Sequence, residues 1–383
     1  MKVLLTATSL ERNYGGPAFS ISRLATALVD SGVEVGLWAA DGSAPGTQLL
    51  PKQTLVQRFT GSESEALNRF GGADIFHDNG IWLPHNHRIA VLAERGRIPR
   101  VVSLRGMLEP WAFRHKHAKK KVAWWLYQRR DLIRAQCHIT TSQAEAENLR
   151  RHALGVPIAT IPNGVDLPED RALKIDMKSS IGNRQKTAVF LGRIYPVKGL
   201  PMLVEAWARV RPVGWRLLIA GPDEAGHQKQ VEEALSAARL GDEVSFVGPV
   251  EGKTKSDLLF NADLFVSPTY SENFGMAIAE ALAHRVPVLT TTGAPWPMLQ
   301  ESGSGWWVKP TLDGISEGLR QATNRDLKSL QQMGNNGRDL VSRQFGWSRV
   351  AHLMRSTYEE VLRRPSHEDE EGKPTTRLTR GEV

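Results

Sequence analysis

The chain has 383 residues, a formal net charge of +8 and 41% hydrophobic residues. The length favours two domains, and the composition excludes a disordered or disulfide-stapled protein. A single cysteine, Cys137, leaves no intramolecular disulfide and suits a reducing compartment. The apolar run Val3, Leu4 and Leu5 is too short for a signal peptide, and no run of about 18 apolar residues predicts a transmembrane helix. We expect a cytoplasmic protein.

The net charge is concentrated in one part of the chain. Between Arg95 and Arg134, twelve Lys or Arg residues are opposed only by Glu109 and Asp131, which gives this stretch a charge of +10 and leaves about −2 for the rest. A basic charge confined in this way predicts a surface that binds anions, such as phospholipid, nucleic acid or a diphosphate.

Short β-rich apolar runs alternate with helix-like stretches along both halves of the chain. In the first half the runs are 3–7, 33–40, 74–77, 100–104, 138–141 and 158–161. The alternation breaks after residue 161 and resumes at 187–191, 216–220, 244–247, 264–267 and 286–290. Strands that alternate with helices predict parallel sheets. We expect an α/β fold of two Rossmann-like domains facing across a cleft, because such sheets bind ligands at the carboxyl ends of their strands.

The same pattern sets the expected domain boundaries. We predict an N-terminal domain over residues 1–165, a linker over 166–185, a second domain over 186–346, a C-terminal helix over 347–364 and a tail over 365–383. The tail has no apolar periodicity, so we expect it to be disordered.

The segment from Tyr270 to Ala283 carries the strongest local signal. It follows an apolar run and becomes helical near Gly275. Glu280 stands in a helix that is apolar nearly all round, where a carboxylate is costly unless something hydrogen-bonds to it. Ribose hydroxyls and a buried arginine are equally good candidates for that partner. Glu272 lies before the helix, where free amides and the helix dipole favour anions.

A second signal, from Phe190 to Leu200, also follows a strand and leads into a helix. Arg193 offers a rigid fork of N–H donors and Lys198 a compact charge, and together they suit two phosphate groups. The alternative is that both residues form surface salt bridges. Their position at the carboxyl end of a strand favours the phosphate role.

Other familiar motifs are weak or absent. Gly15 and Gly16 form a glycine turn before a predicted helix, which suits close approach of backbone amides to a diphosphate but is equally compatible with a plain strand-to-helix turn. The sequence has no H-E-x-x-H and no D-x-D motif, and its histidine pairs lack nearby carboxylates. We therefore expect no metal site.

These residues together resemble a known family. The first motif is Gly-Arg193-x4-Lys198-Gly, and about 75 residues later comes Glu272-x7-Glu280, with Phe274-Gly275 inside it. This pair of motifs is similar to that of the retaining nucleotide-sugar glycosyltransferases of family 4, also called group 1. The N-terminal glycine turn, Pro-Asn-Gly-Val-Asp at 162–166 and Ala-Gly-Pro at 220–222 extend the resemblance over nearly the whole chain. It implies a GT-B fold whose second domain binds the donor and whose C-terminal helix crosses back to the first. It also implies transfer with retention that needs no metal or other cofactor.

The resemblance also implies a role for each matching residue. Arg193 and Lys198 would hold the donor diphosphate and stabilise the charge that develops as the glycosidic bond breaks. Glu272, the third residue assigned to catalysis, would bind hydroxyls of the transferred sugar, and Glu280 would bind the ribose hydroxyls. The other expected donor-binding residues are Gly15, Gly16, Asn273, Phe274, Gly275 and Met276.

One departure from the family pattern is Arg105, which stands where many relatives have a histidine after an N-domain strand. The role of that histidine is therefore not transferred to this chain. Arg105 is a candidate contact for a phosphate of donor or acceptor, with a structural ion pair as the alternative. The stretch from Arg105 to Trp111 and the basic residues after it resemble a subset of bacterial enzymes that build surface polysaccharides.

The basic stretch over residues 114–130 predicts a helix with two sides. Lysines lie on one side and Val122, Trp125 and Leu126 on another, which suits the headgroups of an anionic membrane. The alternative is a core-packed helix with solvated lysines. A nucleic-acid surface would need a reading motif or dispersed stacking aromatics, and neither is recognisable. The expected membrane contacts are Lys116, Lys119, Lys120, Lys121, Trp124 and Trp125.

These inferences converge on one expected function. The chain would be a hexosyltransferase that moves a sugar from a nucleoside-diphosphate donor to a glycan or lipid-linked glycan. The setting would be bacterial surface polysaccharide or lipopolysaccharide synthesis at the inner face of the cytoplasmic membrane. One rival is a nucleotide-sugar epimerase on the same fold, which would need no acceptor. The other is a non-catalytic protein that binds anions or nucleic acid.

Overall fold

A computed structural model of the chain describes residues 1–11, 14–43, 50, 54–109, 117–169 and 185–364. By its internal contacts the chain divides into two compact units. Unit 1 comprises Met1–Thr140, Arg150–Ile161 and Ala351–Val383, and unit 2 comprises Thr141–Leu149 and Pro162–Val350. The predicted tail and most of the predicted linker, 170–184, lie outside the described residues.

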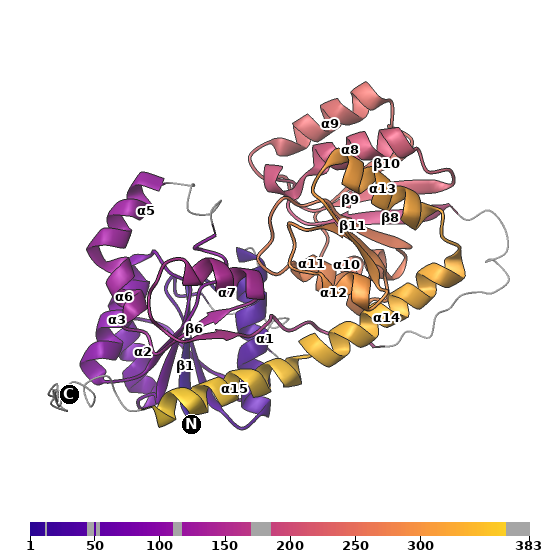
Figure 1. Cartoon of the computed structure of the whole chain (residues 1–383). Helices are drawn as coiled ribbons and strands as arrows, with labels where there is room; N and C mark the ends of the chain where they lie inside the picture. Colours follow the sequence, from indigo (N-terminus) through magenta and orange to yellow (C-terminus); the bar gives the residue numbers. More distant parts are fainter. Residues whose placement is uncertain (12–13, 44–49, 51–53, 110–116, 170–184, 365–383) are drawn as a thin grey trace, which may run out of the picture. The chain divides into compact units, whose positions relative to one another are not determined.

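Unit 1 contains a parallel sheet (Figure 1). Its strand order is β3-β2-β1-β4-β5-β6-β7. Its strands are β1 (Lys2–Ala7), β2 (Glu34–Ala39), β3 (Gln57–Phe59), β4 (Ile75–Asn79), β5 (Arg100–Ser103), β6 (Cys137–Thr140) and β7 (Ile158–Thr160). The strand order reverses between β1 and β4. Loops that diverge at such a point leave room for a ligand at the carboxyl ends of the strands.

Helices cover both faces of this sheet, with α2 and α3 on one side and α1 on the other in Figure 1. In the described ranges the helices with residues in unit 1 are α1 (Gly16–Asp30), α2 (Glu63–Phe70), α3 (Pro84–Gly96), α5 (His117–Ala123), the π-helical turn η2 (Trp124–Gln128), α6 (Arg129–Ile133), the last residue of α7 (Gln143–Arg150) and α15 (Trp347–Arg363). One core cluster joins Leu4, Trp38 and Phe76 on the strands to Phe70 and Ile89 on α2 and α3. A parallel strand that is covered on both faces needs apolar residues along its whole length. The sequence therefore indicated most of these strands as continuous apolar runs.

The C-terminal helix α15 is held in unit 1 by a buried polar contact. Tyr358 is fully buried, and its hydroxyl lies 2.5 Å from Nδ1 of His77 on β4. The other ring nitrogen of His77 lies 2.7 Å from the Ser103 hydroxyl on β5. Because buried polar groups are costly without partners, these contacts fix the position of α15 against the sheet.

Two buried histidines should make the stability of unit 1 depend on pH. Burial, with a smaller effect of the Arg105 charge, lowers the pKa of His77 to about 3, and burial lowers the pKa of His138 to about 4. The folded state thus binds fewer protons than the unfolded state below pH 6.5, so stability present above that pH is lost on acidification. Burial raises the pKa of Asp78 to about 6. Between pH 6 and 4 the folded state therefore binds more protons at Asp78 than the unfolded state does, so this carboxyl group adds stability on acidification.

We expect His77→Gln to reduce the loss of unfolding free energy between pH 6.5 and 5 by about 2 kcal/mol, because the substituted residue does not titrate. Urea unfolding at several pH values measures this slope. The absolute stability of the variant is irrelevant to the comparison. An unchanged slope would show that His77 does not contribute to the acid sensitivity.

Unit 2 contains a second parallel sheet, with the strand order β10-β9-β8-β11-β12-β13. Its strands are β8 (Lys186–Leu191), β9 (Trp215–Ala220), β10 (Val244–Gly248), β11 (Leu264–Ser267), β12 (Val288–Thr291) and β13 (Gly305–Val308). The helices with residues in unit 2 are α7 (Gln143–Arg150), η3 (Pro196–Lys198), α8 (Leu200–Val210), α9 (His227–Ala238), α10 (Gly252–Phe260), α11 (Met276–Ala283), α12 (Met298–Glu301), α13 (Leu312–Thr323), α14 (Leu327–Phe345) and the start of α15. Trp207 of α8 belongs to one core cluster and Leu282 of α11 to another.

The predicted α/β fold with two Rossmann-like parallel sheets is confirmed. The prediction missed β3 and β13, which lie at sheet edges. In β3, Gln57 and Arg58 are exposed, and β13 begins with a glycine. Edge strands are covered less completely than central ones, so they need no long apolar run and give a weaker signal.

Candidate active site

Two loops meet through their backbones at the carboxyl edge of the unit 2 sheet. A Cβ atom at Gly221, after β9, would lie 1.8 Å from the carbonyl oxygen of Gly192, after β8, so only glycine fits there. This contact places Arg193 beside Glu224, with Nη1 and Oε2 2.6 Å apart. The side chains are 56% and 40% exposed, so this is a surface ion pair that contributes little to stability. The Arg193 guanidinium remains accessible to an anion.

The loop that carries Lys198 is joined to the loop after β11. The carbonyl oxygen of Val197 accepts hydrogen bonds from the Tyr270 N–H at 2.8 Å and the Thr269 hydroxyl at 3.1 Å. Gly199 has a φ of 69°, and a Cβ atom there would lie 2.2 Å from the carbonyl oxygen of Pro268. A side chain at position 199 would therefore push the two loops apart.

This junction brings Lys198 and Glu272 together as an ion pair. Their side chains are only 15% and 20% exposed, so the pair is shielded from water more than the Arg193 pair. The backbone N–H of Glu272 donates to the carbonyl oxygen of Gly293 at 2.8 Å, which fixes the carboxylate from a third loop. Two of the three residues predicted to be catalytic thus share one site.

The N-terminus of α11 faces the same loops with its backbone rather than its side chains. Phe274 is 5% exposed and packs against Trp296 and Phe345, with ring centroids 5.5 and 5.4 Å apart. Gly275 caps the helix with a φ of 85° and no side-chain hydrogen bond, and Met276 is its first residue. The first amides of α11 therefore have no side-chain cap, which suits an anion or hydroxyl ligand. The Phe274 side chain belongs to the hydrophobic core of unit 2.

Two polar side chains at or near α11 differ in whether they have a hydrogen-bond partner in the protein. Asn273 has a buried Oδ1 atom with no hydrogen-bond partner among the described residues. Glu280 accepts a hydrogen bond from Lys255 of α10, with Oε1 and Nζ 2.8 Å apart. The protein partner of Glu280 is thus a lysine and not the arginine considered from the sequence.

The carboxyl edge of the unit 1 sheet holds the remaining predicted donor contacts. Gly15 has a φ of 80°, which favours glycine, and Gly16 begins α1; both are exposed, and a Cβ atom at either would touch nothing within 4 Å. Arg105, with a φ of 52°, donates to Asn79 Oδ1 at 2.7 Å and to the Ser20 hydroxyl at 2.8 Å. These bonds hold the guanidinium between the end of β4 and the first turns of α1.

The basic aromatic segment, residues 117–130, has an inner and an outer side. The rings of Trp124 and Trp82 contact each other at a tilt of 44°, with centroids 6.0 Å apart, and the ammonium of Lys120 lies 5.5 Å from the centre of the Trp82 ring. Trp125 is 89% exposed, and Lys119 and Lys121 are also exposed. The other members described as exposed are Ala118, Val122, Leu126, Arg129 and Arg130. Lys116 and the residues from Pro110 to His115 lie outside the described part of the chain.

Neither a metal cluster nor a spanning helix is present in the described ranges. No group of three or more His, Cys, Asp or Glu side chains there could hold a metal ion. No helix among them is long and apolar enough to cross a membrane.

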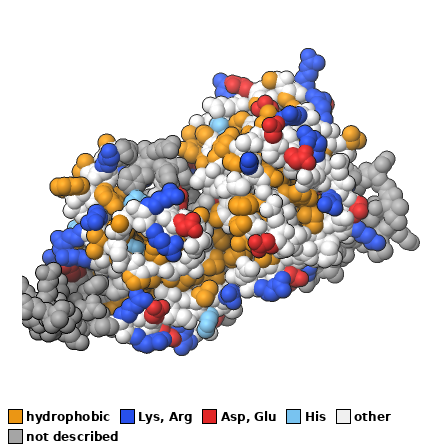
Figure 2. Space-filling model, in the orientation of Figure 1, with side chains coloured by type: hydrophobic (Ala, Val, Ile, Leu, Met, Phe, Trp, Pro, Cys, Tyr) orange, Lys and Arg blue, Asp and Glu red, His pale blue; other side chains and the backbone are white. Residues whose placement is uncertain are grey.

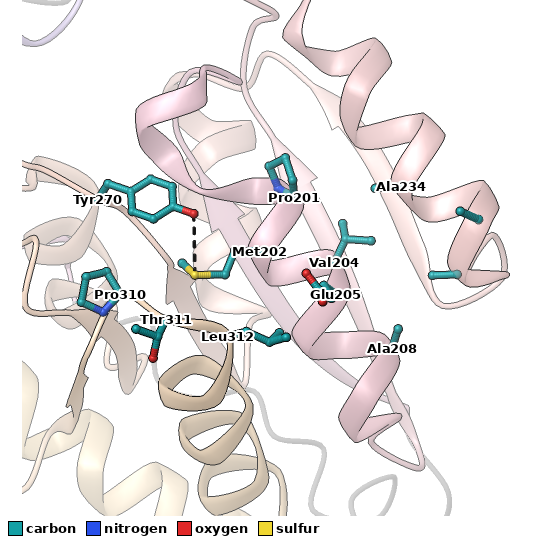
Figure 3. Close-up of a pocket in the computed structure, with 12 residues that line it drawn as sticks. Pro201, Met202, Val204, Glu205, Ala208, Ala234, Tyr270, Pro310, Thr311 and Leu312 are labelled. Atoms are coloured by element: carbon teal, nitrogen blue, oxygen red, sulfur yellow. Dashed lines mark hydrogen bonds between the residues drawn. The ribbon is translucent and has the colours of Figure 1, made fainter.

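A cavity of about 660 Å³ lies beside this site in unit 2 (Figure 3). Side chains of α8 and α9, Tyr270 and the residues before α13 line it, and Glu205 is its only charged lining residue in the described chain. It lacks the cations that a diphosphate requires. We therefore place the candidate site at the loops that carry Arg193, Lys198 and Glu272.

Comparisons with known proteins identify the class of the molecule. Residues 14–169 match the family described as Glycosyltransferase Family 4, and residues 173–340 match Glycosyl transferases group 1. The D-inositol 3-phosphate glycosyltransferase of Streptomyces bingchenggensis is 26% identical, over 91% of this chain and 85% of that protein. The GDP-mannose:cellobiosyl-diphosphopolyprenol alpha-mannosyltransferase of Komagataeibacter xylinus is 26% identical, over 78% of this chain and 75% of that one.

The solved structures show the same fold. The structure of Anabaena HepE in complex with UDP and glucose has a TM-score of 0.71 at 19% identity, covering 94% of this chain and 100% of that one. Two consecutive family matches, relatives that align over most of their length and two Rossmann-like sheets agree with one another. The chain is an enzyme of the group 1 glycosyltransferase family, with the GT-B fold.

Proposed function

We propose that the chain transfers a hexosyl group, with retention, from a nucleoside-diphosphate sugar to a lipid-linked glycan in bacterial surface polysaccharide synthesis. The observation that carries the proposal is the shielded Lys198–Glu272 pair, whose lysine shares with Arg193 the connection between β8 and α8 at the carboxyl edge of the unit 2 sheet. Two cations suit a diphosphate, and a carboxylate suits sugar hydroxyls. The reported complex of the HepE structure with UDP and glucose agrees with a donor of this kind.

In this proposal the bond between the sugar's anomeric carbon and the diphosphate breaks, and its electron pair stays on the diphosphate. Arg193 and Lys198 stabilise that charge, which grows towards the transition state. The acceptor hydroxyl oxygen forms the new bond to the anomeric carbon, and its proton passes to the departing diphosphate. Glu272 orients the sugar, and Glu280 binds the ribose hydroxyls. No step requires a metal ion.

The ion pairs in the ligand-free site have a consequence for binding. Arg193 is paired with Glu224, and Lys198 with Glu272. Both cations therefore exchange or share a carboxylate partner when the donor diphosphate binds. The exposed Arg193 pair does so at low cost, because surface ion pairs contribute about 0–1 kcal/mol.

In unit 1, we propose that the exposed amides at Gly15 and Gly16 and the guanidinium of Arg105 contact a phosphate of donor or acceptor. The amides stand at the N-terminus of a helix of 15 residues, where the helix dipole favours anions. Arg105 donates hydrogen bonds to the side chains of Asn79 and Ser20, which place its guanidinium near the first turns of α1. Its charge adds to that of the helix N-terminus.

The names of two relatives point to acceptors of different chemistry. The name of the Komagataeibacter relative gives a diphosphopolyprenol-linked acceptor, and that of the Streptomyces relative gives inositol 3-phosphate. We favour a lipid-linked acceptor because this chain exposes basic and apolar side chains together on the basic aromatic segment. Inositol phosphate, a small anion in solution, offers no reason for an exposed tryptophan.

The basic aromatic segment is also the proposed contact with an anionic membrane. Figure 2 shows Lys and Arg side chains, in blue, with orange hydrophobic side chains among them on the face of unit 1 that it presents. An exposed indole such as Trp125 suits the headgroup region, and each basic residue near an anionic surface contributes about 1 kcal/mol. The enzyme would bind peripherally at the inner face of the cytoplasmic membrane.

We expect the double substitution Lys119→Gln and Lys121→Gln to weaken binding to anionic vesicles by roughly tenfold or more, because two exposed charges are lost. Sedimentation with phosphatidylglycerol vesicles measures the effect, and added salt should weaken binding of the parent in the same way. The matched control is Lys229→Gln with Lys328→Gln, two exposed lysines of unit 2. Equal binding by the parent and the segment variant would contradict the membrane role.

The proposed function is tested by release of nucleoside diphosphate from UDP- and GDP-sugars, with and without a polyprenyl-diphosphate glycan. Acceptor-dependent release with a product of retained anomeric configuration supports the proposal, and it should persist in EDTA. Conversion of the donor sugar without any acceptor would favour an epimerase. Transfer only to inositol phosphate would refute the lipid-linked acceptor, and complete loss in EDTA that magnesium restores would reveal a metal requirement.

A further inference from the structure

Lys255 is the cation that contacts Glu280, and it comes from a different helix. Its Nζ atom on α10 lies 2.8 Å from Oε1 of Glu280 on α11. The side chains of Lys255 and Glu280 are 30% and 17% exposed. The loop before α10 follows β10, so the pair also lies on the carboxyl side of the sheet.

The neighbouring lysine on α10 forms a different kind of contact. Lys253 pairs with Asp257 of the same helix at 2.5 Å, and its side chain is 77% exposed. Such a pair between residues four apart stabilises a helix by a few tenths of a kcal/mol. Lys253 therefore provides a control of equal charge on the same element.

The geometry at Glu280 leaves one carboxylate oxygen for a ligand. Oε1 accepts the hydrogen bond from Lys255, and Oε2 accepts none from the residues that the structure describes. An ionised carboxylate has about four acceptor positions on its two oxygens. A ribose presents two neighbouring hydroxyl donors, and a 2′-deoxyribose presents one fewer.

We propose that Lys255 is a positioning residue for recognition of the ribose. It holds Oε1 of Glu280, fixes the carboxylate plane and directs Oε2 towards the ribose hydroxyls, so that it sets the preference for ribonucleotides over 2′-deoxyribonucleotides. This inference rests on the proposed function, in which Glu280 binds the donor ribose. A carboxylate that rotates freely loses this directionality, because hydrogen bonds weaken steeply away from their preferred angle.

The test is titration calorimetry of the full chain with UDP, GDP and ADP and with their 2′-deoxy counterparts. The measured quantity is the ratio of the two dissociation constants for whichever base binds. For the parent and Lys253→Gln we expect a preference for the ribonucleotide of about tenfold or more, as hydrogen bonds to charged groups give. For Lys255→Gln and Lys255→Met we expect that ratio to fall to about threefold or less.

Lys255→Arg should keep most of the preference, because the guanidinium also donates to a carboxylate. If the pair only joins α10 to α11, the Lys255 variants will weaken both nucleotides equally and leave the ratio unchanged, which would overturn the inference while nucleotide binding itself remains. If the parent binds none of the three nucleoside diphosphates, the proposed function fails and this inference fails with it. A ratio that falls equally in Lys253→Gln would also overturn it, by showing a nonspecific charge effect.

Discussion

Replacing Lys198 with alanine should slow sugar transfer by about 100-fold or more, the usual loss when one group that stabilises transition-state charge is removed. Arg193→Ala should have an effect of the same order. Lys198 is only 15% exposed and held by Glu272 from another loop, so it is presented in a fixed position and partly shielded from water. Initial rates of nucleoside diphosphate release with saturating acceptor measure both effects.

The control for this prediction is Lys253→Ala, which removes an exposed lysine of unit 2 and should leave turnover nearly unchanged. Because Lys198 and Glu272 are in direct contact, their substitutions should not be additive: Lys198→Ala with Glu272→Gln should be little worse than Lys198→Ala alone. Near-normal turnover in both Arg193→Ala and Lys198→Ala would refute the assignment of the diphosphate site.

Removing the buried Arg100 should destabilise unit 1 by about 3–5 kcal/mol, since it leaves a buried carboxylate without its cation. Arg100 is 4% exposed on β5, and its Nη1 lies 3.6 Å from Oδ2 of Asp78, which is 1% exposed on β4. The same guanidinium donates to the backbone oxygen of Asp131. We expect this loss for Arg100→Met in urea unfolding followed by circular dichroism.

A second substitution separates the charge effect from the loss of packing. Adding Asp78→Asn to Arg100→Met should recover part of the lost stability, because the uncompensated charge is removed. Arg134→Met, at a side chain that is 44% exposed and paired with Glu94, should cost less than about 1 kcal/mol. A cost for Arg100→Met no larger than that of Arg134→Met would show that the buried pair does not contribute to stability.

Most of the strands, and the sheet edge at which Arg193 and Glu272 lie, were predictable from the sequence. Central parallel strands are covered on both faces, so runs such as 187–191 and 264–267 must be apolar to be buried. Parallel sheets bind ligands at one edge, so Arg193 and Glu272, which follow two such runs, were expected together. The edge strands β3 and β13 gave little signal, since β3 exposes Gln57 and Arg58 and β13 begins with a glycine.

The partner of each charged residue was decided only by the tertiary structure. Glu224 and Lys255 stand in ordinary polar stretches, and no local pattern marks them as partners of Arg193 and Glu280. The basic aromatic segment was predicted to be helical, and its described residues are, but the pattern did not indicate the π-helical turn η2, in which Trp124 contacts Trp82 and Trp125 is exposed. The periodicity of apolar residues and the spacing of motifs indicate which residues of a single helix or strand are buried. Which side chains meet depends on how loops distant in the sequence pack against each other, and that is set by long-range contacts such as the approach of Gly199 to Pro268.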